Sequence, residues 1–313
     1  MKQELKPFLR ASWLIFGGVV CAVVVLLNTT CTQAQNLFVS DFGSDGLGSS
    51  YIYEFTPGGT RSTFASGLGF PQGLAFDGTG NLFVAGRDIG GGLIYKFTPS
   101  GTQSILRYNA GGAQGLAFDS AGHLFVARVG GYIDKYTLGA TVTVSTFGRA
   151  ASNAYGLAFD STGNLFVTEN DFSLLYKFTP AGTRSYSAYG LSLPTGLAFD
   201  SAGDLFVANV GVGVTGSGSI TEIKPNGTYS IFASGLDQPV GLAFDGAGNL
   251  FVADHLSGNI YEFAPDGTRS TFASGLTGPT FIAFWPVPEP SVLALLAIGP
   301  TLLVVRCFRK LAA

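Results

Sequence analysis

Residues 241–276 read GLAFDGAGNLFVADHLSGNIYEFAPDGTRSTFASGL, and this stretch decides the fold. Four short runs rich in Leu, Phe, Val, Tyr and Ile are separated by turns of glycine, proline, asparagine and aspartate. Glycine supplies the positive φ that tight turns need, and proline pre-sets φ at the start of a turn. Runs of this length and composition, bounded by such turns, are typical of β-strands. The stretch therefore predicts a four-stranded antiparallel sheet.

Most of the chain between residues 36 and 285 repeats this unit. The second strand recurs at intervals of 40–45 residues, beginning at Leu37, Leu82, Leu124, Leu165, Leu205 and Leu250. This period, with four strands per repeat, is that of a β-propeller blade. The runs LAF and LFVA are apolar on both faces, as expected when each sheet packs between two neighbours. The sequence therefore predicts six blades.

The two ends of the repeat array are incomplete in complementary ways. The array opens on a second strand, Leu37-Phe38-Val39, and finishes on a first strand, residues 281–284. A stacked solenoid would leave both half-units unpaired, whereas a blade shared between the ends closes a ring. We therefore predict an all-β, six-bladed β-propeller of four-stranded antiparallel blades over residues 36–285, with the C-terminal strand joining the N-terminal blade.

The N-terminal segment predicts export. Basic residues at positions 2, 6 and 10 precede an apolar run, residues 13–27, and small residues follow up to Ala34. This order is typical of a secretory signal peptide, which we assign to residues 1–34 with signal peptidase as the processing enzyme. An uncleaved anchor is the alternative, and both interpretations predict a hydrophobic helix. The three cysteines lie outside the propeller, which therefore has no disulfide and no cysteine nucleophile.

The C-terminal segment carries a second sorting pattern. Pro288, Glu289 and Pro290 are followed by an apolar run, residues 291–305, and then by a basic end. In this order, the three parts resemble a PEP-CTERM sorting signal over residues 286–313. The resemblance implies a bacterial envelope, surface or extracellular protein, inserted transiently in the inner membrane and processed by an exosortase-like enzyme. As a helix, the fifteen apolar positions would span about 22 Å, short of a hydrocarbon core of about 30 Å. A permanent anchor is the alternative.

Charge excludes one class of partner. The propeller region has 18 acidic and 11 basic residues, a net charge of −7, without a basic run or an aromatic–basic stripe. Nucleic-acid-binding domains normally present a basic patch. We therefore expect no nucleic-acid partner, and nothing in the repeats indicates a cofactor.

Two copies show the repeat pattern most clearly: GNLFVADHLSGNIYEFAPDG (Gly248–Gly267) and GNLFVTENDFSLLYKFTPAG (Gly163–Gly182). Their Gly-hydrophobic-Val-Ala-Asp turn and later aromatic-x-Phe-x-Pro-x-Gly resemble the NHL family of propellers. The Asn-His-Arg that often follows the first element in that family is absent from every copy. The resemblance implies the architecture and says little about function, because such propellers include binding platforms and enzymes.

Gluconolactonase-like propellers share this shape and hold a divalent metal at the central channel. The residues directly before the first strands lack a carboxylate: Gln72, Gln114, Tyr155, Thr195, Val240 and Thr280. The positions after the second strands are richer in ligand atoms: Asp41, Gly86, Arg128, Glu169, Asn209 and Asp254. A cation site from the four acidic and amide residues of this ring is one interpretation. The other is that they are favoured turn residues at hairpin ends.

Virginiamycin B lyase-like propellers, a second family of this shape, need a histidine base. This chain has two histidines, His123 and His255. His123 replaces the asparagine of the first-to-second turn, which indicates a turn residue. His255 lies on the variable side without a placed partner, so we assign no general base.

Variation among the copies predicts where a ligand binds. The first-to-second and third-to-fourth turns hardly change, whereas the second-to-third loops vary in length and content. Binding residues concentrate on loops held by rigid scaffolds. We therefore place the candidate ligand-binding residues on this variable face: Asp41, Arg87, Arg128, Glu169, Asn209, Asp254, His255, Gln72, Gln114 and Tyr155. A solvated rim without a ligand is the alternative.

The sequence thus predicts an exported, non-enzymatic binding or scaffold module at the bacterial cell surface or extracellular matrix. Its expected ligand is an extracellular polysaccharide or a surface protein, and we expect no catalytic residue and no resident metal. The rival prediction is a metal-dependent hydrolase or lyase that uses Asp41, Glu169, Asn209 and Asp254.

Overall fold

The computed structural model describes residues 15–16, 19–20, 35–43, 50–87 and 91–286. The chain divides into two units, residues 1–32 and 33–313. In the first unit, β1 (Ile15–Phe16) pairs antiparallel with β2 (Val19–Val20). These four residues are strands, not the helix that we predicted, and β-branched residues such as Ile15, Val19 and Val20 favour a strand.

The remaining predictions for the two ends of the chain concern residues that the structure does not describe. The rest of the predicted signal peptide, the predicted C-terminal helix and the Pro288-Glu289-Pro290 motif lie outside the described residues. Within the described part of the chain there is no helix, and so none with the length and hydropathy to cross a membrane.

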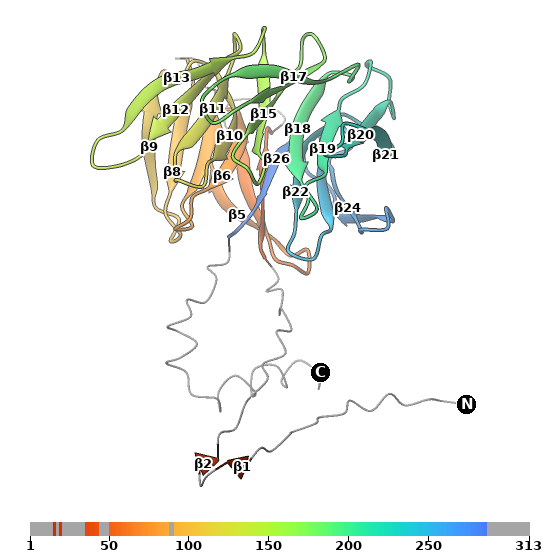
Figure 1. Ribbon diagram of the computed structural model, residues 1–313, viewed down its shortest axis with the longest axis horizontal. Helices are drawn as coiled ribbons and strands as arrows, with labels where there is room; N and C mark the ends of the chain where they lie inside the picture. The colour runs from red at the N-terminus through yellow and green to blue at the C-terminus, as the bar shows by residue number, and fades with distance from the viewer. Residues whose placement is uncertain (1–14, 17–18, 21–34, 44–49, 88–90, 287–313) are drawn as a thin grey trace. The chain divides into compact units, whose positions relative to one another are not determined.

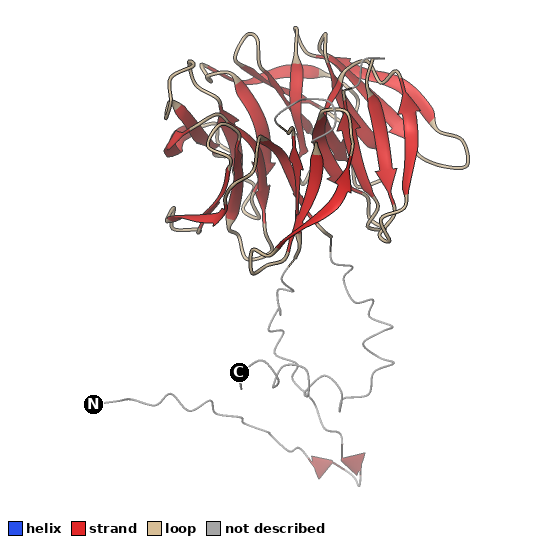
Figure 2. Cartoon of the chain, turned by 180° about the vertical axis from the view of Figure 1, so that it is seen from behind, coloured by secondary structure: helices blue, strands red, loops and turns tan. Residues whose placement is uncertain are grey.

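The second unit is a ring of six four-stranded antiparallel sheets (Figures 1 and 2). The first strands are β26 (Pro279–Phe284), β6 (Pro71–Phe76), β10 (Ala113–Phe118), β14 (Ala154–Phe159), β18 (Pro194–Phe199) and β22 (Pro239–Phe244). The second strands are β3 (Leu37–Asp41), β7 (Leu82–Gly86), β11 (Leu124–Arg128), β15 (Leu165–Glu169), β19 (Leu205–Asn209) and β23 (Leu250–Asp254). The third strands are β4 (Tyr51–Phe55), β8 (Leu93–Phe97), β12 (Tyr132–Thr137), β16 (Leu174–Phe178), β20 (Gly218–Ile223) and β24 (Asn259–Phe263). The fourth strands are β5 (Arg61–Ser66), β9 (Gln103–Tyr108), β13 (Thr143–Arg149), β17 (Arg184–Tyr189), β21 (Tyr229–Leu236) and β25 (Arg269–Ala273).

The predicted ring closure is confirmed. One sheet has the order β26-β3-β4-β5, so the last strand of the array completes the first blade. In this blade the backbone N–H of Trp285 donates to the carbonyl of Asn36 at 2.9 Å. In the next blade the matching bond, from Asp77 N–H to the Asn81 carbonyl, closes the first-to-second turn at 3.0 Å. In the shared blade, the two ends of the repeat array, at Asn36 and Trp285, therefore take the place of the first-to-second turn.

The first strands begin three residues earlier than the apolar LAF run predicted. In all six first strands the pairing with the second strand shifts register between the first residue and the fourth, as between Pro71 and Leu74. Such a β-bulge interrupts the regular alternation of side chains and bends the strand. Five of these bulges contain a glycine, for example Gly196, where a Cβ atom would collide with the carbonyl oxygen of Val240 in the next blade. Glycine therefore allows neighbouring first strands to approach each other around the channel.

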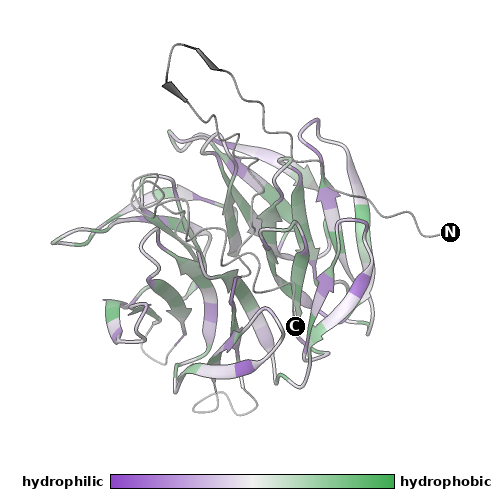
Figure 3. Cartoon of the chain, turned by 90° about the horizontal axis from the view of Figure 1, so that it is seen from below, coloured by the Kyte–Doolittle hydropathy of each residue, from purple (hydrophilic) through white to green (hydrophobic). Residues whose placement is uncertain are grey.

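The core consists of six apolar clusters, each between two neighbouring blades. At every junction a second-strand phenylalanine meets a first-strand phenylalanine of the next blade edge to face. The pairs are Phe38–Phe76, Phe83–Phe118, Phe125–Phe159, Phe166–Phe199, Phe206–Phe244 and Phe251–Phe284, with centroids 5.0–5.1 Å apart. The strands toward the middle of the ring carry most of the hydrophobic colour in Figure 3. Because each blade buries both faces against its neighbours, the ring folds as a whole.

Candidate functional site

A cavity of about 240 Å³ opens on the variable face, beside the start of three consecutive first strands. Gly112 and Ala113 form part of its wall, and the larger side chains that line it are Gln72, Arg87, Gln114, Val129, Asn153 and Tyr155. Four of these, Gln72, Arg87, Gln114 and Tyr155, are residues that the sequence predicted for this face. The lining therefore combines amides, one phenol and one guanidinium, and it includes no carboxylate among the described residues.

Few of the polar groups in this cavity are used within the protein. The Gln114 side-chain amide donates from Nε2 to Oδ1 of Asn153 at 2.8 Å. The Tyr155 hydroxyl donates to Oε1 of Gln72 at 3.4 Å, a long bond. Arg87 forms no ion pair with a carboxylate of the described residues, and its side chain is exposed. The cavity therefore retains donors and acceptors that a polar ligand can bind.

Two aromatic rings stack beside the cavity. Tyr155 on β14 and Phe281 on β26 belong to opposite blades of the ring, and their rings stack with centroids 5.7 Å apart and planes 19° apart. Burial raises the pKa of Tyr155 to about 12, so its hydroxyl stays protonated and remains a hydrogen-bond donor. The stack thus joins opposite blades of the ring, and its tyrosine contacts Gln72 of the cavity.

Hydroxyl groups support the two strands that carry this stack. The Phe281 N–H donates to Oγ of Ser40 at 3.0 Å, and the equivalent N–H of Gly156 donates to Oγ1 of Thr168 at 2.8 Å. Both hydroxyls also donate to a carbonyl of the following blade, that of Gln72 for Ser40 and that of Thr195 for Thr168. In the other four blades the corresponding second-strand residue is alanine. The hydroxyls therefore occur only in the two blades that supply the stacked aromatic rings.

The acidic and amide residues that end the second strands lie in a different environment. Asp41, Glu169, Asn209 and Asp254 are at most 2% exposed. Each accepts a backbone N–H from the connection that leads into the first strand of its own blade; Asp41, for example, accepts from Thr277 and Gly278, both at 2.9 Å. Glu169 accepts from Asn153 at 3.0 Å and so positions a residue of the cavity. Among the described residues, no three His, Asp or Glu side chains gather as metal ligands would.

Asp254 differs from its counterpart Asn209 in one respect. Its Oδ2 accepts from the Asp237 N–H at 3.0 Å and from the Ser257 hydroxyl at 2.8 Å, whereas Oδ1 is buried without a partner. Burial raises the pKa of the Asp254 carboxyl, against the opposing effect of these hydrogen bonds. Asn209 instead places an amide nitrogen there, which donates to Oγ1 of Thr221 at 2.9 Å. Both residues stabilise a loop.

The remaining predicted residues lie outside the cavity. Nε of Arg128 is 3.0 Å from Oδ2 of Asp134, and its guanidinium lies over the Tyr132 ring. Nδ1 of His255 is 3.3 Å from the Pro279 carbonyl oxygen. Nδ1 of His123 is 2.8 Å from Oδ2 of Asp119, in the first-to-second turn. His123 thus contacts its own turn, Arg128 contacts the third strand of its own blade, and His255 contacts the first strand of the following blade.

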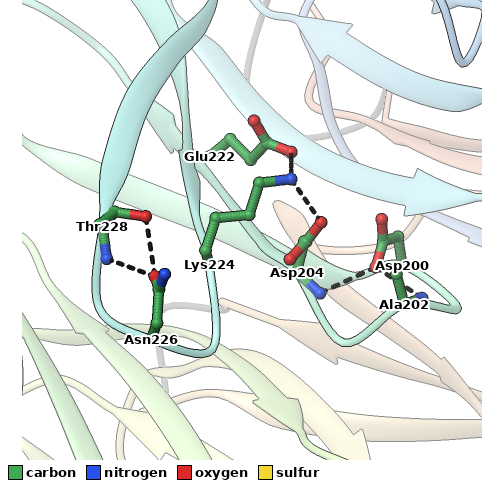
Figure 4. A network of polar contacts seen from close by, with 7 residues as sticks. All are labelled: Asp200, Ala202, Asp204, Glu222, Lys224, Asn226 and Thr228. Carbon is green, nitrogen blue, oxygen red and sulfur yellow. Dashed lines mark hydrogen bonds and ion pairs between the residues drawn. The ribbon is translucent and has the colours of Figure 1, made fainter.

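A larger cavity of about 430 Å³ lies on the opposite face, along the turns of two adjacent blades. One of its two lysines, Lys224, has its Nζ 2.6 Å from a carboxylate oxygen of both Asp204 and Glu222 (Figure 4). These two hydrogen bonds raise the pKa of Lys224, and the bond with Asp204 makes the larger contribution. Asp204 stands where four other blades have asparagine, and Lys224 compensates the additional charge. The contacts maintain the turns, so we regard this cavity as structural.

Three residues of the site, Val129, Asn153 and Phe281, were not predicted from the sequence. Asn153 lies in a fourth-to-first connection, where the copies share no pattern that marks a cavity residue. Phe281 did have a signal, because it replaces the glycine found at positions 73, 115, 156, 196 and 241. A side chain at that one position indicates that the sixth first strand differs in its contacts at the channel.

Comparisons with known proteins support the propeller fold and do not identify the function. No protein-family model matches the chain, and no curated protein matches it. Among solved structures, a Bacteroides caccae protein of unknown function is 15% identical, with a TM-score of 0.62 over 82% of this chain and 100% of that one. A proposed gluconolactonase is 13% identical, with a TM-score of 0.60 over 78% of this chain and 89% of that one. A catalytically inactive Staphylococcus aureus virginiamycin B lyase with quinupristin is 14% identical, with a TM-score of 0.57 over 83% and 94%. Identities this low show the six-bladed propeller fold alone.

Proposed function

We propose that this protein is a binding module whose ligand enters the cavity on the variable face, and that it does so without catalysing a reaction. The ligand we propose is an extracellular polysaccharide or the glycan of a surface protein. The observation that carries the proposal is the convergence of Gln72, Gln114, Asn153, Tyr155 and Arg87 around one opening. Neutral amides and hydroxyls in a preformed pocket are suited to a polyhydroxylated ligand.

The same geometry supports binding over the rival reaction. A metal-dependent hydrolase or lyase needs carboxylates directed at a shared cation. Here the oxygens of Asp41, Glu169 and Asn209 accept N–H groups of their own loops. If these side chains turned to bind a metal, the buried N–H groups that they now accept would lose their acceptors, at a cost of about 1–3 kcal/mol each. We therefore propose that they preserve the loops around the cavity.

Filling the cavity should abolish binding without affecting the fold. Val129 lines the cavity and is 49% exposed, so Val129→Trp can occupy the opening without repacking the core. The control is Val212→Trp, at an exposed second-to-third loop of another blade. On a polysaccharide array we expect binding by the native chain and by Val212→Trp, and at least tenfold weaker binding by Val129→Trp. Equal binding by the two variants, or no binding by the native chain, would contradict the proposal.

We also propose export, with sorting by an exosortase-type system and a final location at the cell surface or in the matrix. The support is the order of basic, apolar and small residues up to Ala34, and the Pro288-Glu289-Pro290 pattern near the other end. Intact-mass measurement of the mature protein from its host should show a chain that begins near Gln35 and ends near this motif. A mature chain that retains Met1 or Ala313 would overturn the corresponding half of the proposal.

A further inference from the structure

We infer that the cavity selects an acidic sugar, one whose carboxylate pairs with Arg87 while its hydroxyl groups meet the amides. This inference rests on the proposed function and adds the chemical class of the ligand. Its starting point is the charge of the lining. Arg87 is the one charged residue there, so the cavity is locally positive on a propeller whose sequence carries an excess of acidic residues.

Arg87 is available for an external partner. Its backbone N–H is already used, donating to the Gly69 carbonyl at 2.8 Å, which fixes the residue at the end of β7. Its guanidinium has no carboxylate partner among the described residues. Arg128, one repeat position earlier in the following blade, is by contrast paired with Asp134. A guanidinium presents a planar set of donors that matches a carboxylate in a bidentate manner.

The amide side chains of the cavity would bind the hydroxyl groups of the sugar. Gln72 is 9% exposed, yet its side chain borders the cavity, where Oε1 accepts the long bond from the Tyr155 hydroxyl. The bond between Gln114 and Asn153 uses one donor and one acceptor and leaves the Gln114 carbonyl and an Asn153 N–H. These groups are open to the cavity, so a ligand that supplies both donors and acceptors can bind them. Sugar hydroxyls supply both.

The size of the cavity limits the ligand. A volume of about 240 Å³ is below the range of about 300–1,000 Å³ that holds drug-sized ligands. It suits one ring of a saccharide with its carboxylate, and the open side would allow the rest of a polymer to continue outside. A lone carboxylate or an inorganic anion would leave the amides unused.

The test uses the full-length chain and two defined probes. A galacturonate trisaccharide presents the ring carboxylates, and the neutral galactose trisaccharide of the same linkage lacks them. Isothermal titration calorimetry should show tighter binding of the acidic probe. In Arg87→Gln, we expect the affinity for the acidic probe to fall about 10- to 100-fold, the effect of losing a charged hydrogen bond. Its affinity for the neutral probe should change less than threefold.

Two further variants separate this inference from the proposed function. Arg107→Gln removes the same charge from an exposed position of the same blade outside the cavity lining, and should bind both probes as the native chain does. Gln114→Met removes an amide while retaining much of the side-chain volume, and should weaken both probes. If the native chain binds both probes equally, or if Arg87→Gln behaves like Arg107→Gln, acid selection is wrong while saccharide binding stands. If neither probe binds, the inference is wrong, and the array decides whether the proposed function survives.

Discussion

A chain that ends at Gly278 should lose its cooperative thermal unfolding transition, whereas a chain that ends at Pro290 should keep it. The shorter chain lacks β26, the strand that pairs with β3 and completes the shared blade. It also loses Phe284, which packs edge to face on Phe251 of the preceding blade. Removal of this one strand therefore opens the ring at two junctions.

The size of this effect follows from burial. Ile282 is 5% exposed, and burying such a side chain is worth about 1.5–3 kcal/mol. Phe281 and Phe284 contribute smaller amounts because they are half-buried, and the aromatic pair adds about 0.5–1.5 kcal/mol. The loss is comparable with the whole stability of a domain, about 5–15 kcal/mol.

Circular dichroism melts of the two chains decide the result, with size-exclusion chromatography as a second measurement. The chain ending at Gly278 should melt without cooperativity or form oligomers through the unpaired edge of β3. Equal melting temperatures for two monomeric chains would show that the ring is not closed by β26.

Replacing Gly196 by alanine should also have a large effect. The added Cβ atom would collide with the Val240 carbonyl oxygen and approach the backbone of Gly241 and Leu242. Backbone cannot rotate away as a side chain can, so two first strands must separate. Overpacking of this kind costs about 1–3 kcal/mol, and in a domain of this size each kcal/mol lowers the melting temperature by about 2–4 °C.

Gly78→Ala is the matched control for this substitution. Gly78 lies in a first-to-second turn, and an added Cβ atom there would meet no heavy atom within 4 Å. Its φ is not positive, so alanine introduces no backbone strain. We expect a melting temperature within about one degree of the native chain or slightly higher. If Gly196→Ala melts with the control, the close approach of the first strands has no energetic role.

The blade number and the closure of the ring could be predicted because both follow from the repeat. The period counts the blades, and the complementary half-units at residues 37–39 and 281–284 indicate the shared one. The start of each first strand was missed for a physical reason. A bulge such as the one between Pro71 and Leu74 breaks the alternation of side chains. The strand therefore begins before the apolar run from which it was predicted.

The candidate site was predictable in part. The repeat register places Gln72, Gln114 and Tyr155 before the first strands, and the structure brings these three together. The register could not show which way Asp41 and Glu169 turn, because that depends on loop N–H groups that approach from other segments. A carboxylate at a strand end has the same sequence context whether it faces a ligand or its own backbone.

The hydrogen bond between Trp285 and Asn36 has a consequence for how this propeller can be attached to a support or to another domain. Because the chain enters and leaves at adjacent points where the other blades have a first-to-second turn, both covalent attachments share the face opposite the cavity. A polymer, a bead or a fused domain joined through either end should therefore leave the cavity mouth directed away from the attachment point. Immobilisation through the N-terminal or the C-terminal side should yield the same accessible surface.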